Sequence, residues 1–493
     1  MSGVWYLGQA DPHVPAAEAA VNAWRAAFPP HKLAGAVEFC QAEILNLIVD
    51  NLTAATPQTL SDPKTTPPEE MEAKYTRTVA MSLVSYANLL ECVTKLDPEK
   101  HSALLDSPKF WKLAKHKAGD IRKSFFVAVT QLCLKLPESI GSRGALVVPA
   151  VLCNLQDTES GDALWTCVLQ LLSTLPTAWT LVNPAKAVFP PVWKLLSSGA
   201  DGNPSRVHPY LMPFLSKIPL TVMDDCGKFL NRWFAAMLES LETVKEKKSS
   251  SQCDTVVKAF LECMFYTLNH KDIDISIKQG LVREHLIPGL QKVPKNQAMF
   301  SSLSEYLLYW DRTAETNTDI AQLNLLFWSE LKFLTLGEEL DIDFLISLAN
   351  ALDREQTKDT KNVLETRRSV VDLIKIFESI WINQVANLKQ SDKVSAALDT
   401  MYKILANVGH QSEIFYQKSP VDFYRENIVP LLTDLSLEGA VARLTWVYAA
   451  RQPQEPALAV LDLLVTGSRP SVISRLTAEA RRSPGTYYII FSP

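Results

Sequence analysis

The chain has 493 residues, of which 47% are hydrophobic and 21% are charged, and its net charge is −5. This balance is typical of a folded globular protein, and it excludes a wholly disordered chain and a strongly basic nucleic-acid binder. The first fifteen residues contain no basic and no continuous apolar region, so they predict no secretory signal. Residues 163–185 are uncharged, but Gln170, Pro176 and Asn183 interrupt them, which predicts buried helices and no membrane span.

Prolines divide the chain into helical segments. A motif of an apolar residue, proline and further apolar residues at helical spacing recurs, and proline at the first turn of a helix is favourable because its fixed φ suits the helix. The motif occurs at Pro149, Pro190, Pro209, Pro288 and Pro430. We expect each of these prolines to begin a helix.

A second set of prolines closes segments. Pro137, Pro176 and Pro219 lie about 40 residues apart, and Pro294 follows after about two such intervals. A period of this length built from two helices is typical of HEAT and armadillo arrays, because one helical hairpin cannot bury its apolar face alone. The sequence therefore predicts an all-α fold, a HEAT/ARM-like helical-repeat solenoid.

Composition suggests where the array is interrupted. We predict HEAT-like repeats over 1–244 with an irregular loop at 53–70, and a polar linker at 245–254, where "KEKKSSSQCD" has little apolar content. Further HEAT-like repeats are expected over 255–450 and a terminal helical segment over 451–482. Residues 483–493, "SPGTYYIIFSP", form a divergent tail that is rich in aromatic and β-branched residues.

Residues 109–136 are predicted to form one helical hairpin of the array. "KFWKLAKHK" predicts a helix with lysines on one arc and Phe110 and Leu113 on the other. Gly119 is expected to end this helix in the left-handed conformation, and Asp120 to cap the next one. The second helix then carries an apolar stripe at helical spacing, which consists of Ile121, Phe125, Ala128, Leu132 and Leu136.

The same hairpin contains the candidate site. A basic binding patch is predicted from Lys109, Lys112, Lys115, Lys117, Arg122 and Lys123. Such a patch can neutralise phosphates without reading a base sequence. The alternative is that these side chains belong to an ordinary solvated helix face. A phosphate-binding loop is excluded because the stretch has one glycine and no preceding strand.

Sequence motifs of catalysis and metal binding are absent from the chain. We find no H-E-x-x-H, Walker, G-x-S-x-G or G-x-G-x-x-G motif, and His116 has no identifiable nucleophile or orienting partner. No two of the eight cysteines form a C-x-x-C pair, which favours a reducing compartment. We therefore predict no catalytic, cofactor-binding or metal-ligating residue, and we expect the tryptophans to fill the core.

Several long stretches resemble the listerin family of RING-type ubiquitin ligases. They include "AAEAAVNAWRAAFPPHKLAGAVEFCQAEILNLI" (16–48), "TPQTLSDPKTTPPEEMEAKYTR" (56–77) and "KFWKLAKHKAGDIRKSFF" (109–126). "NPAKAVFPPVWKLLSSG" (183–199) and "HPYLMPFLSKIP" (208–219) continue the resemblance in the same order. The similarity extends from about residue 4 to about residue 482.

The resemblance implies a function in ribosome-associated quality control. Listerins are long HEAT/ARM solenoids that end in RWD and RING modules. They bind the large ribosomal subunit with its stalled nascent chain, together with the nuclear export mediator factor, and ubiquitylate the chain for proteasomal degradation. By resemblance we expect a cytosolic, ribosome-associated, monomeric arm of such a ligase, which meets a ubiquitin-conjugating enzyme only through a RING supplied elsewhere.

The chain differs from the family at its ends. It starts without the family's basic, polar leader, and it contains none of the closely spaced Cys/His pairs with which a RING holds zinc. We therefore expect zinc only in a RING outside this chain, and we expect the chain to be inactive alone. We interpret the chain as a truncated or alternatively spliced product or a gene-model artefact. Two other functions stay open. One is an adaptor or transport HEAT protein. The other is a self-contained enzyme, which the missing motifs disfavour.

Overall fold

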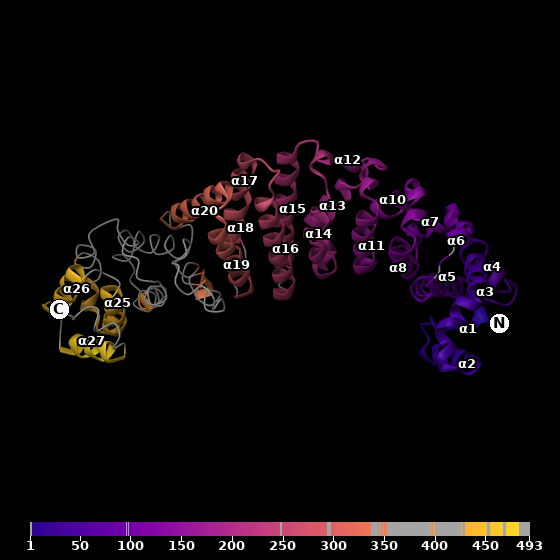
Figure 1. Ribbon diagram of the computed structural model, residues 1–493, viewed down its shortest axis with the longest axis horizontal. Coiled ribbons are helices and arrows are strands. Elements are labelled where there is room, and N and C mark those ends of the chain that lie inside the picture. Colours follow the sequence, from indigo (N-terminus) through magenta and orange to yellow (C-terminus); the bar gives the residue numbers. More distant parts are fainter. Residues whose placement is uncertain are drawn as a thin grey trace. The chain divides into compact units, whose positions relative to one another are not determined.

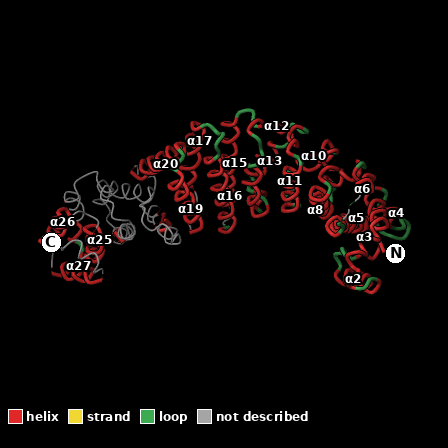
Figure 2. The backbone as a smooth tube through the Cα atoms, viewed as in Figure 1, coloured by secondary structure: helices red, strands yellow, loops and turns green. Residues whose placement is uncertain are grey.

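Helices account for the secondary structure of the computed structural model, which describes residues 2–94, 96, 98–246, 249–292, 297–336, 429–450, 454–466 and 470–482 and a few residues between 344 and 425. Within these residues there is no strand, as Figure 2 shows. The chain divides into two compact units, residues 1–263 and 264–493. The prediction of an all-α, helical-repeat protein is confirmed.

The first unit is a series of short and long helices. They are α1 (Ser2–Gly8), α2 (Val14–Ala27), α3 (Leu33–Thr53), α4 (Pro57–Leu60), α5 (Pro68–Cys92), α6 (Pro98–Leu105), α7 (Pro108–Lys112), α8 (Gly119–Lys135), α9 (Pro137–Ser142), α10 (Gly144–Leu152), α11 (Gly161–Thr174), α12 (Pro184–Ala187), α13 (Phe189–Ser197), α14 (Leu211–Leu215), α15 (Cys226–Glu246) and the first part of α16 (Ser250–Asn269). Short 3-10 turns connect them, among them η2 (Leu113–Lys115), η3 (Pro176–Thr180), η5 (Pro204–Arg206) and η6 (His208–Tyr210).

The second unit continues the helical pattern. Its described elements are α17 (Ile275–Leu281), the π-helical turn η8 (Val282–Leu286), α18 (Ile287–Lys292), α19 (Gln297–Thr313), α20 (Thr318–Leu336), the 3-10 turns η11 (Val429–Thr433) and η12 (Leu435–Leu437), α25 (Glu438–Ala450), α26 (Gln454–Thr466) and α27 (Pro470–Arg482). The predicted terminal segment 451–482 thus contains α26 and α27. The predicted tail 483–493 lies outside the described residues.

Stacking of successive hairpins forms the core of the first unit. Helix α8 packs between α5 and α11, and α11 in turn contacts α14, so these helices lie side by side in chain order (Figure 1). The predicted stripe of α8 is buried, because Ile121, Phe125, Ala128 and Leu132 have no exposed surface and Leu136 is 5% exposed. Burying such side chains is the main favourable term in folding.

Aromatic side chains connect neighbouring hairpins. The ring of Trp165 on α11 lies 5.3 Å from that of Phe214 on α14, and the rings of Trp193 on α13 and Trp233 on α15 are 5.9 Å apart. Aromatic pairs in this range add to the stabilisation that burial provides. The tryptophans predicted as core fillers are buried, which agrees with that prediction: Trp111, Trp165, Trp193, Trp233 and Trp328.

Polar contacts join residues about 40 positions apart, which is the length of one repeat. The indole N–H of Trp179 donates to the Lys217 carbonyl (2.8 Å), and the Thr174 hydroxyl donates to the Cys133 carbonyl (3.3 Å). Each contact spans one repeat, as expected when a hairpin is stabilised chiefly by its neighbours. The period inferred from the prolines therefore corresponds to physical contacts.

Not every proline begins a helix. Pro190 lies in the first turn of α13 and Pro209 in that of η6, as predicted, and Pro430 lies in the first turn of η11. Pro149 instead lies inside α10, and that prediction is wrong. Pro288 lies in the first turn of α18, as predicted, although α18 directly continues the π-helical turn η8; such a turn accommodates the missing proline N–H.

Two predicted irregular segments contain helices. The expected linker 245–254 is mostly helical, because α15 continues to Glu246 and α16 begins at Ser250. The physical reason is that Val244 and Cys253 are buried, so the apolar stripes of both helices extend into this polar stretch. The expected loop 53–70 contains α4, whose first turn is held by a reciprocal capping box between Thr56 and Thr59.

Candidate functional site

The lysines of the predicted patch lie around one buried aromatic pair. Phe110 and Trp111 on α7 are buried, and the Trp111 indole N–H donates to the Leu105 carbonyl at 2.8 Å. Lys109, Lys112 and Lys115 are exposed on the other side of α7 and η2. The predicted two-sided pattern of this segment is therefore present, and we call these three residues the lysine ridge.

The members of the lysine ridge differ in their contacts. The Lys109 ammonium group donates to the Thr53 carbonyl at 2.7 Å, at the negative end of the α3 dipole. Lys112 and Lys115 make no ion pair with a residue that the structure describes. Lys115 lies near Cys153. Burial raises the pKa of the Cys153 thiol and the Lys115 ammonium group lowers it, and the net result is a raised pKa. Two of the three charges are thus free to bind a phosphate.

Arg122 does not belong to a solvent-facing patch. Its side chain is 15% exposed, and its guanidinium group binds Asp157 through two hydrogen bonds of 2.7 and 3.0 Å. It also donates to a carboxylate oxygen of Glu159 at 2.6 Å. The remaining N–H groups reach the His116 and Lys117 carbonyls at 2.8 and 3.1 Å. All five donors are used inside the protein, so we remove Arg122 from the predicted patch.

These contacts join two neighbouring repeats. Burial would raise the pKa of Asp157, but hydrogen bonds from Arg122 and Ser160 outweigh it and hold that pKa below its ordinary value. Asp157 is therefore ionised at neutral pH and forms a bidentate pair with Arg122, the strongest ion-pair geometry available to a protein. The sequence could not reveal this pair, because its two residues are 35 positions apart.

The turn before α8 differs from its prediction. Gly119 is the first residue of α8 and does not have a positive φ, and Asp120 lies in the first turn of that helix instead of capping it. Ala118 occupies the cap position. Position 119 requires a glycine for another reason: a Cβ there would lie 2.5 Å from the Glu159 carboxylate that binds Arg122. The turn is thus shaped by the next repeat and not by a left-handed helix end.

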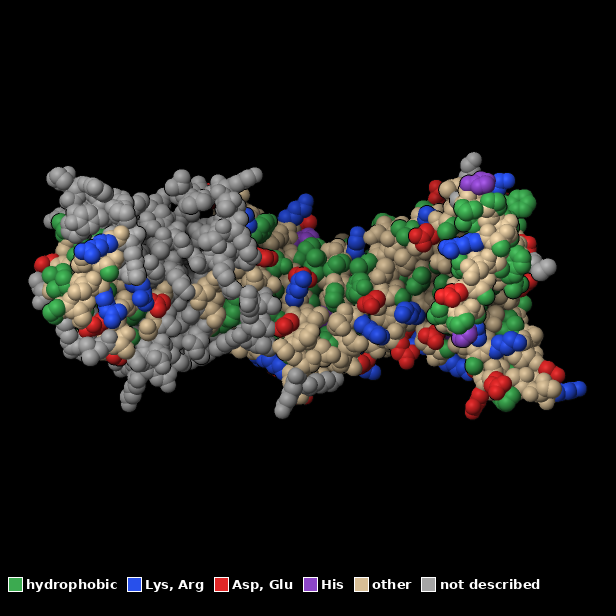
Figure 3. Space-filling view, turned by 90° about the horizontal axis from the view of Figure 1, so that it is seen from below, with side chains coloured by type: hydrophobic (Ala, Val, Ile, Leu, Met, Phe, Trp, Pro, Cys, Tyr) green, Lys and Arg blue, Asp and Glu red, His purple; other side chains and the backbone are tan. Residues whose placement is uncertain are grey.

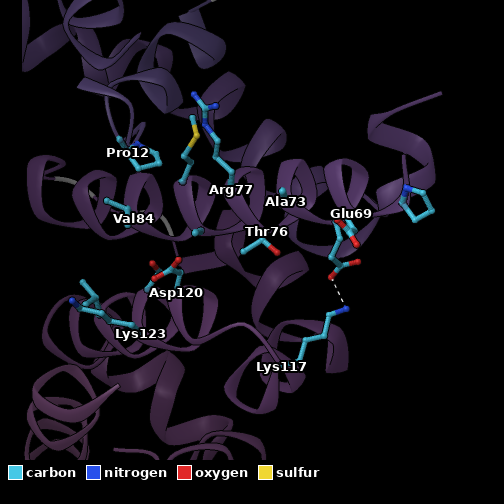
Figure 4. A pocket seen from close by; sticks show the side chains of 16 residues that line it. Pro12, Glu69, Ala73, Thr76, Arg77, Val84, Lys117, Asp120 and Lys123 are labelled. Atoms are coloured by element: carbon cyan, nitrogen blue, oxygen red, sulfur yellow. Dashed lines mark ion pairs between the residues drawn. The ribbon is translucent and has the colours of Figure 1, made fainter. Parts of the chain in front are cut away.

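Lys117 and Lys123 line a groove between α5 and α8. We call it the α5–α8 groove; its volume is about 1080 Å³. Three segments far apart in sequence form it: the connection between α1 and α2 with Ala10 and Pro12, α5 from Pro68 to Val84, and the start of α8 with the turn before it. In Figure 4, Thr76 and Ala73 on α5 lie above, and Asp120 and Lys123 on α8 lie below.

Two ion pairs hold charged side chains of the groove. Lys117 pairs with the Glu72 carboxylate at 2.9 Å, the contact drawn in Figure 4. Arg77 pairs with Asp11. Burial would raise the pKa of Asp11, but the hydrogen bond from Arg77 lowers it. The six predicted residues thus fall into three places: the exposed lysine ridge, the groove, and the buried contact of Arg122.

His116 is half-buried between these places. Its Nδ1 accepts the Ala118 N–H at 3.1 Å, and its ring centre lies 6.1 Å from that of Tyr75. Burial lowers the pKa of this imidazole, so it is neutral at pH 7. These contacts fit a residue that orders the turn before α8.

The described residues lack two features that would indicate another class of site. They hold no group of three or more His, Cys, Asp or Glu side chains that could bind a metal ion. No helix among them is both long and apolar enough to cross a membrane. On the face that Figure 3 shows, lysines and arginines of the first unit are interspersed with acidic and apolar side chains.

Sequence relatives identify the family. Residues 1–218 match the family model for the E3 ubiquitin-protein ligase listerin, N-terminal domain. The E3 ubiquitin-protein ligase listerin of Mus musculus is 36% identical over 346 residues, which are 67% of this chain and 20% of that protein. The listerin of Gallus gallus is 30% identical over 487 residues, which are 94% of this chain and 26% of that protein. The chain spans about a fifth to a quarter of the length of these curated relatives.

Solved structures add little to this assignment. Kap121p bound to RanGTP aligns over 98% of this chain and 48% of that one, with 12% identity and a TM-score of 0.39, so the assignment rests on the sequence relatives. The chain belongs to the listerin family, and its residues 1–218, which contain both the lysine ridge and the α5–α8 groove, correspond to the family's N-terminal domain.

Proposed function

We propose that this chain is a non-catalytic arm of a listerin-type ubiquitin ligase. It binds the large ribosomal subunit that carries a stalled nascent chain, together with the nuclear export mediator factor, in the cytosol. The observation that carries the proposal is the match of residues 1–218 to the N-terminal domain of listerin. The RING that recruits a ubiquitin-conjugating enzyme, with its zinc ions, is supplied by another part of the ligase.

The helical array suits this function physically. Stacked repeats form an extended scaffold that can hold two bound groups at a set distance, because each repeat is fixed by its neighbours. Contacts such as those of Arg122 and Trp179 cross from one repeat to the next and stiffen the array. A first unit stiffened in this way presents its surface to a binding partner in one geometry.

The lysine ridge is the part of the first unit that we assign to ribosomal RNA. Its three ammonium groups are exposed on two short, adjacent helical turns, and a phosphate backbone is the natural partner of such charges. Because these contacts are electrostatic, binding through them weakens as salt rises. Lys117 and Arg122 are not assigned to this surface, since carboxylates of the same chain already neutralise them.

Charge reversal of the lysine ridge tests this assignment. We expect Lys109→Glu, Lys112→Glu and Lys115→Glu together to weaken binding to large ribosomal subunits at least about tenfold near 0.1 M salt, and to reduce the salt slope by up to about three. The affinity is measured by co-sedimentation over a salt series. Circular dichroism checks that helicity is retained, because Lys109 also contacts the end of α3.

The matched control reverses three other exposed lysines of the first unit, namely Lys186, Lys194 and Lys217. It changes the net charge by the same amount and is expected to reduce affinity only slightly. Equal losses for the two triple variants would show that binding follows net charge alone. An unchanged affinity of the ridge variant would return its lysines to an ordinary solvated face.

A further inference from the structure

The floor of the α5–α8 groove consists of small side chains. Ala73, Thr76 and Ala80 lie on one face of α5, and Ala73 is exposed while the other two are partly covered. Small residues at three- and four-residue spacing allow another helix to approach closely. Ala73 therefore places no charged side chain at an exposed position where an amphipathic helix commonly carries one.

One part of the groove is apolar. Met81 and Val84 on α5 are half-buried, and Val127 on α8 is 38% exposed. Methionine adapts to irregular apolar partners, and a solvent-exposed valine in a hollow loses unfavourable hydration when it is covered. This part of the groove can therefore hold apolar side chains of a bound segment.

The uncompensated charges around the groove are mainly negative. Glu72 and Arg77 are used in ion pairs with Lys117 and Asp11. Glu69 on α5 and Asp120 and Lys123 on α8 make no ion pair with a described residue. Two carboxylates and one ammonium group thus remain, so a bound segment gains most from a basic side chain. A nucleic acid would meet a net negative charge and is disfavoured here.

The walls of the groove select the form of the bound segment. Both are helices whose backbone groups are hydrogen-bonded within the helix, so an extended peptide would find no strand edge to pair with. A helix satisfies its own backbone and can place side chains at i, i+3 and i+7 on the floor. We propose that the α5–α8 groove binds an amphipathic helix of a partner protein, with apolar anchors and separate lysine or arginine side chains facing Glu69 and Asp120, which lie apart along the groove (Figure 4).

A displayed library of helical peptides tests this proposal without ribosomes, so its outcome is independent of the proposed ribosome binding. The probe is a library of sixteen-residue peptides with a fixed helical framework, and the target is the whole chain. We expect the enriched peptides to carry apolar residues at i, i+3 or i+4 and i+7 with a basic residue beside them. Their binding should fall at least tenfold for Ala73→Trp, which fills the floor.

The matched control is Ala103→Trp, the same substitution at an exposed position of α6 outside the groove. It should leave binding of the enriched peptides unchanged. The double variant Glu69→Gln and Asp120→Asn should remove the preference for basic over acidic peptides while preserving helicity. A sixteen-nucleotide single-stranded RNA, measured in parallel, should bind Ala73→Trp and wild type alike.

Three results would overturn the proposal. One is the absence of any enriched peptide whose binding is lost in Ala73→Trp but kept in Ala103→Trp. Another is enrichment of acidic peptides that the double variant does not affect. The third is loss of the RNA, and not of peptides, in Ala73→Trp, which would make the groove a nucleic-acid site.

Discussion

Replacing Arg122 by alanine is expected to lower the local stability of α8 and α11 by about 3 kcal/mol, because it leaves Asp157 charged and largely buried without its partner. The Asp157 side chain is 12% exposed, and both of its oxygens accept hydrogen bonds from Arg122. Glu159 is 69% exposed and is rehydrated when Arg122 is removed, so it contributes little to the loss.

Hydrogen exchange suits this prediction better than a global unfolding curve. In a repeat protein the free energy of opening varies along the chain, so a single unfolding free energy is poorly defined. Peptides covering residues 119–174 should exchange faster in Arg122→Ala, while those covering α19 and α20 serve as an internal reference. The neighbouring exposed residue gives a matched control, Lys123→Ala, which should change exchange little.

A double-mutant cycle isolates the ion pair. If the Arg122–Asp157 contact carries the effect, Arg122→Ala should cost much less in a background of Asp157→Ala, because no buried carboxylate is then left unpaired. Equal costs in the two backgrounds would show that Arg122 acts through its contacts with the His116 and Lys117 carbonyls instead.

Acid is expected to destabilise the first unit through His208 by about 2.5 kcal/mol between pH 7.5 and pH 4.5. His208 is fully buried; its Nδ1 is 3.2 Å from the Pro204 carbonyl and its Nε2 is 3.0 Å from the Ser240 hydroxyl. A carbonyl only accepts, so Nδ1 carries the proton and donates to Pro204, while Nε2 accepts from Ser240. The ring is therefore bound in its neutral form.

The sign of this pH effect follows from the two pKa values. Burial lowers the pKa of His208 to about 4 in the folded protein, although the hydrogen bond to Pro204 opposes the shift. In the unfolded chain it is close to 6.5. The stabilisation is fully present above pH 6.5 and is lost as the pH falls towards 4. In this range His208 binds a proton in the unfolded chain but stays neutral in the folded protein.

The urea midpoint, followed by tryptophan fluorescence, reports this effect as a shift between pH 7.5 and pH 4.5, because Trp165, Trp193 and Trp233 lie in the same part of the core and sense its local unfolding. His208→Gln should be less stable than wild type at pH 7.5 and lose less stability on acidification, so that the two curves converge near pH 4.5. The exposed-histidine variant His31→Gln should stay parallel to wild type. Parallel curves for His208→Gln and wild type would contradict the assignment.

The fold was predictable from sequence because its signals are local. The α8 stripe from Ile121 to Leu136 has helical spacing, and periodicity alone identifies the side that is buried. The proline at position 149 shows the limit of a motif: it stands in the same apolar–proline–apolar motif as Pro190 but lies inside α10, since its place is set by packing along the whole helix. In the same way, the polar composition of 245–254 predicted a linker, although most of this segment is helical.

The site was only partly predictable because its members are brought together by tertiary structure. The lysine ridge is visible in sequence as lysines at helical spacing beside Phe110 and Trp111. The partner of Arg122 is not, because Asp157 belongs to the next repeat. The α5–α8 groove combines three distant segments, and its one sequence signal is Ala73, which stands between the charged residues Glu72 and Lys74 on α5.

The central claim is that this listerin-family chain is a ribosome-binding arm. Co-sedimentation of the 493-residue chain with purified large ribosomal subunits, with and without the nuclear export mediator factor, tests it most directly. We predict binding that weakens with salt and strengthens when the export mediator factor is present. Recovery in the pellet no greater than that of an unrelated HEAT-repeat protein, at every salt concentration, would contradict the claim.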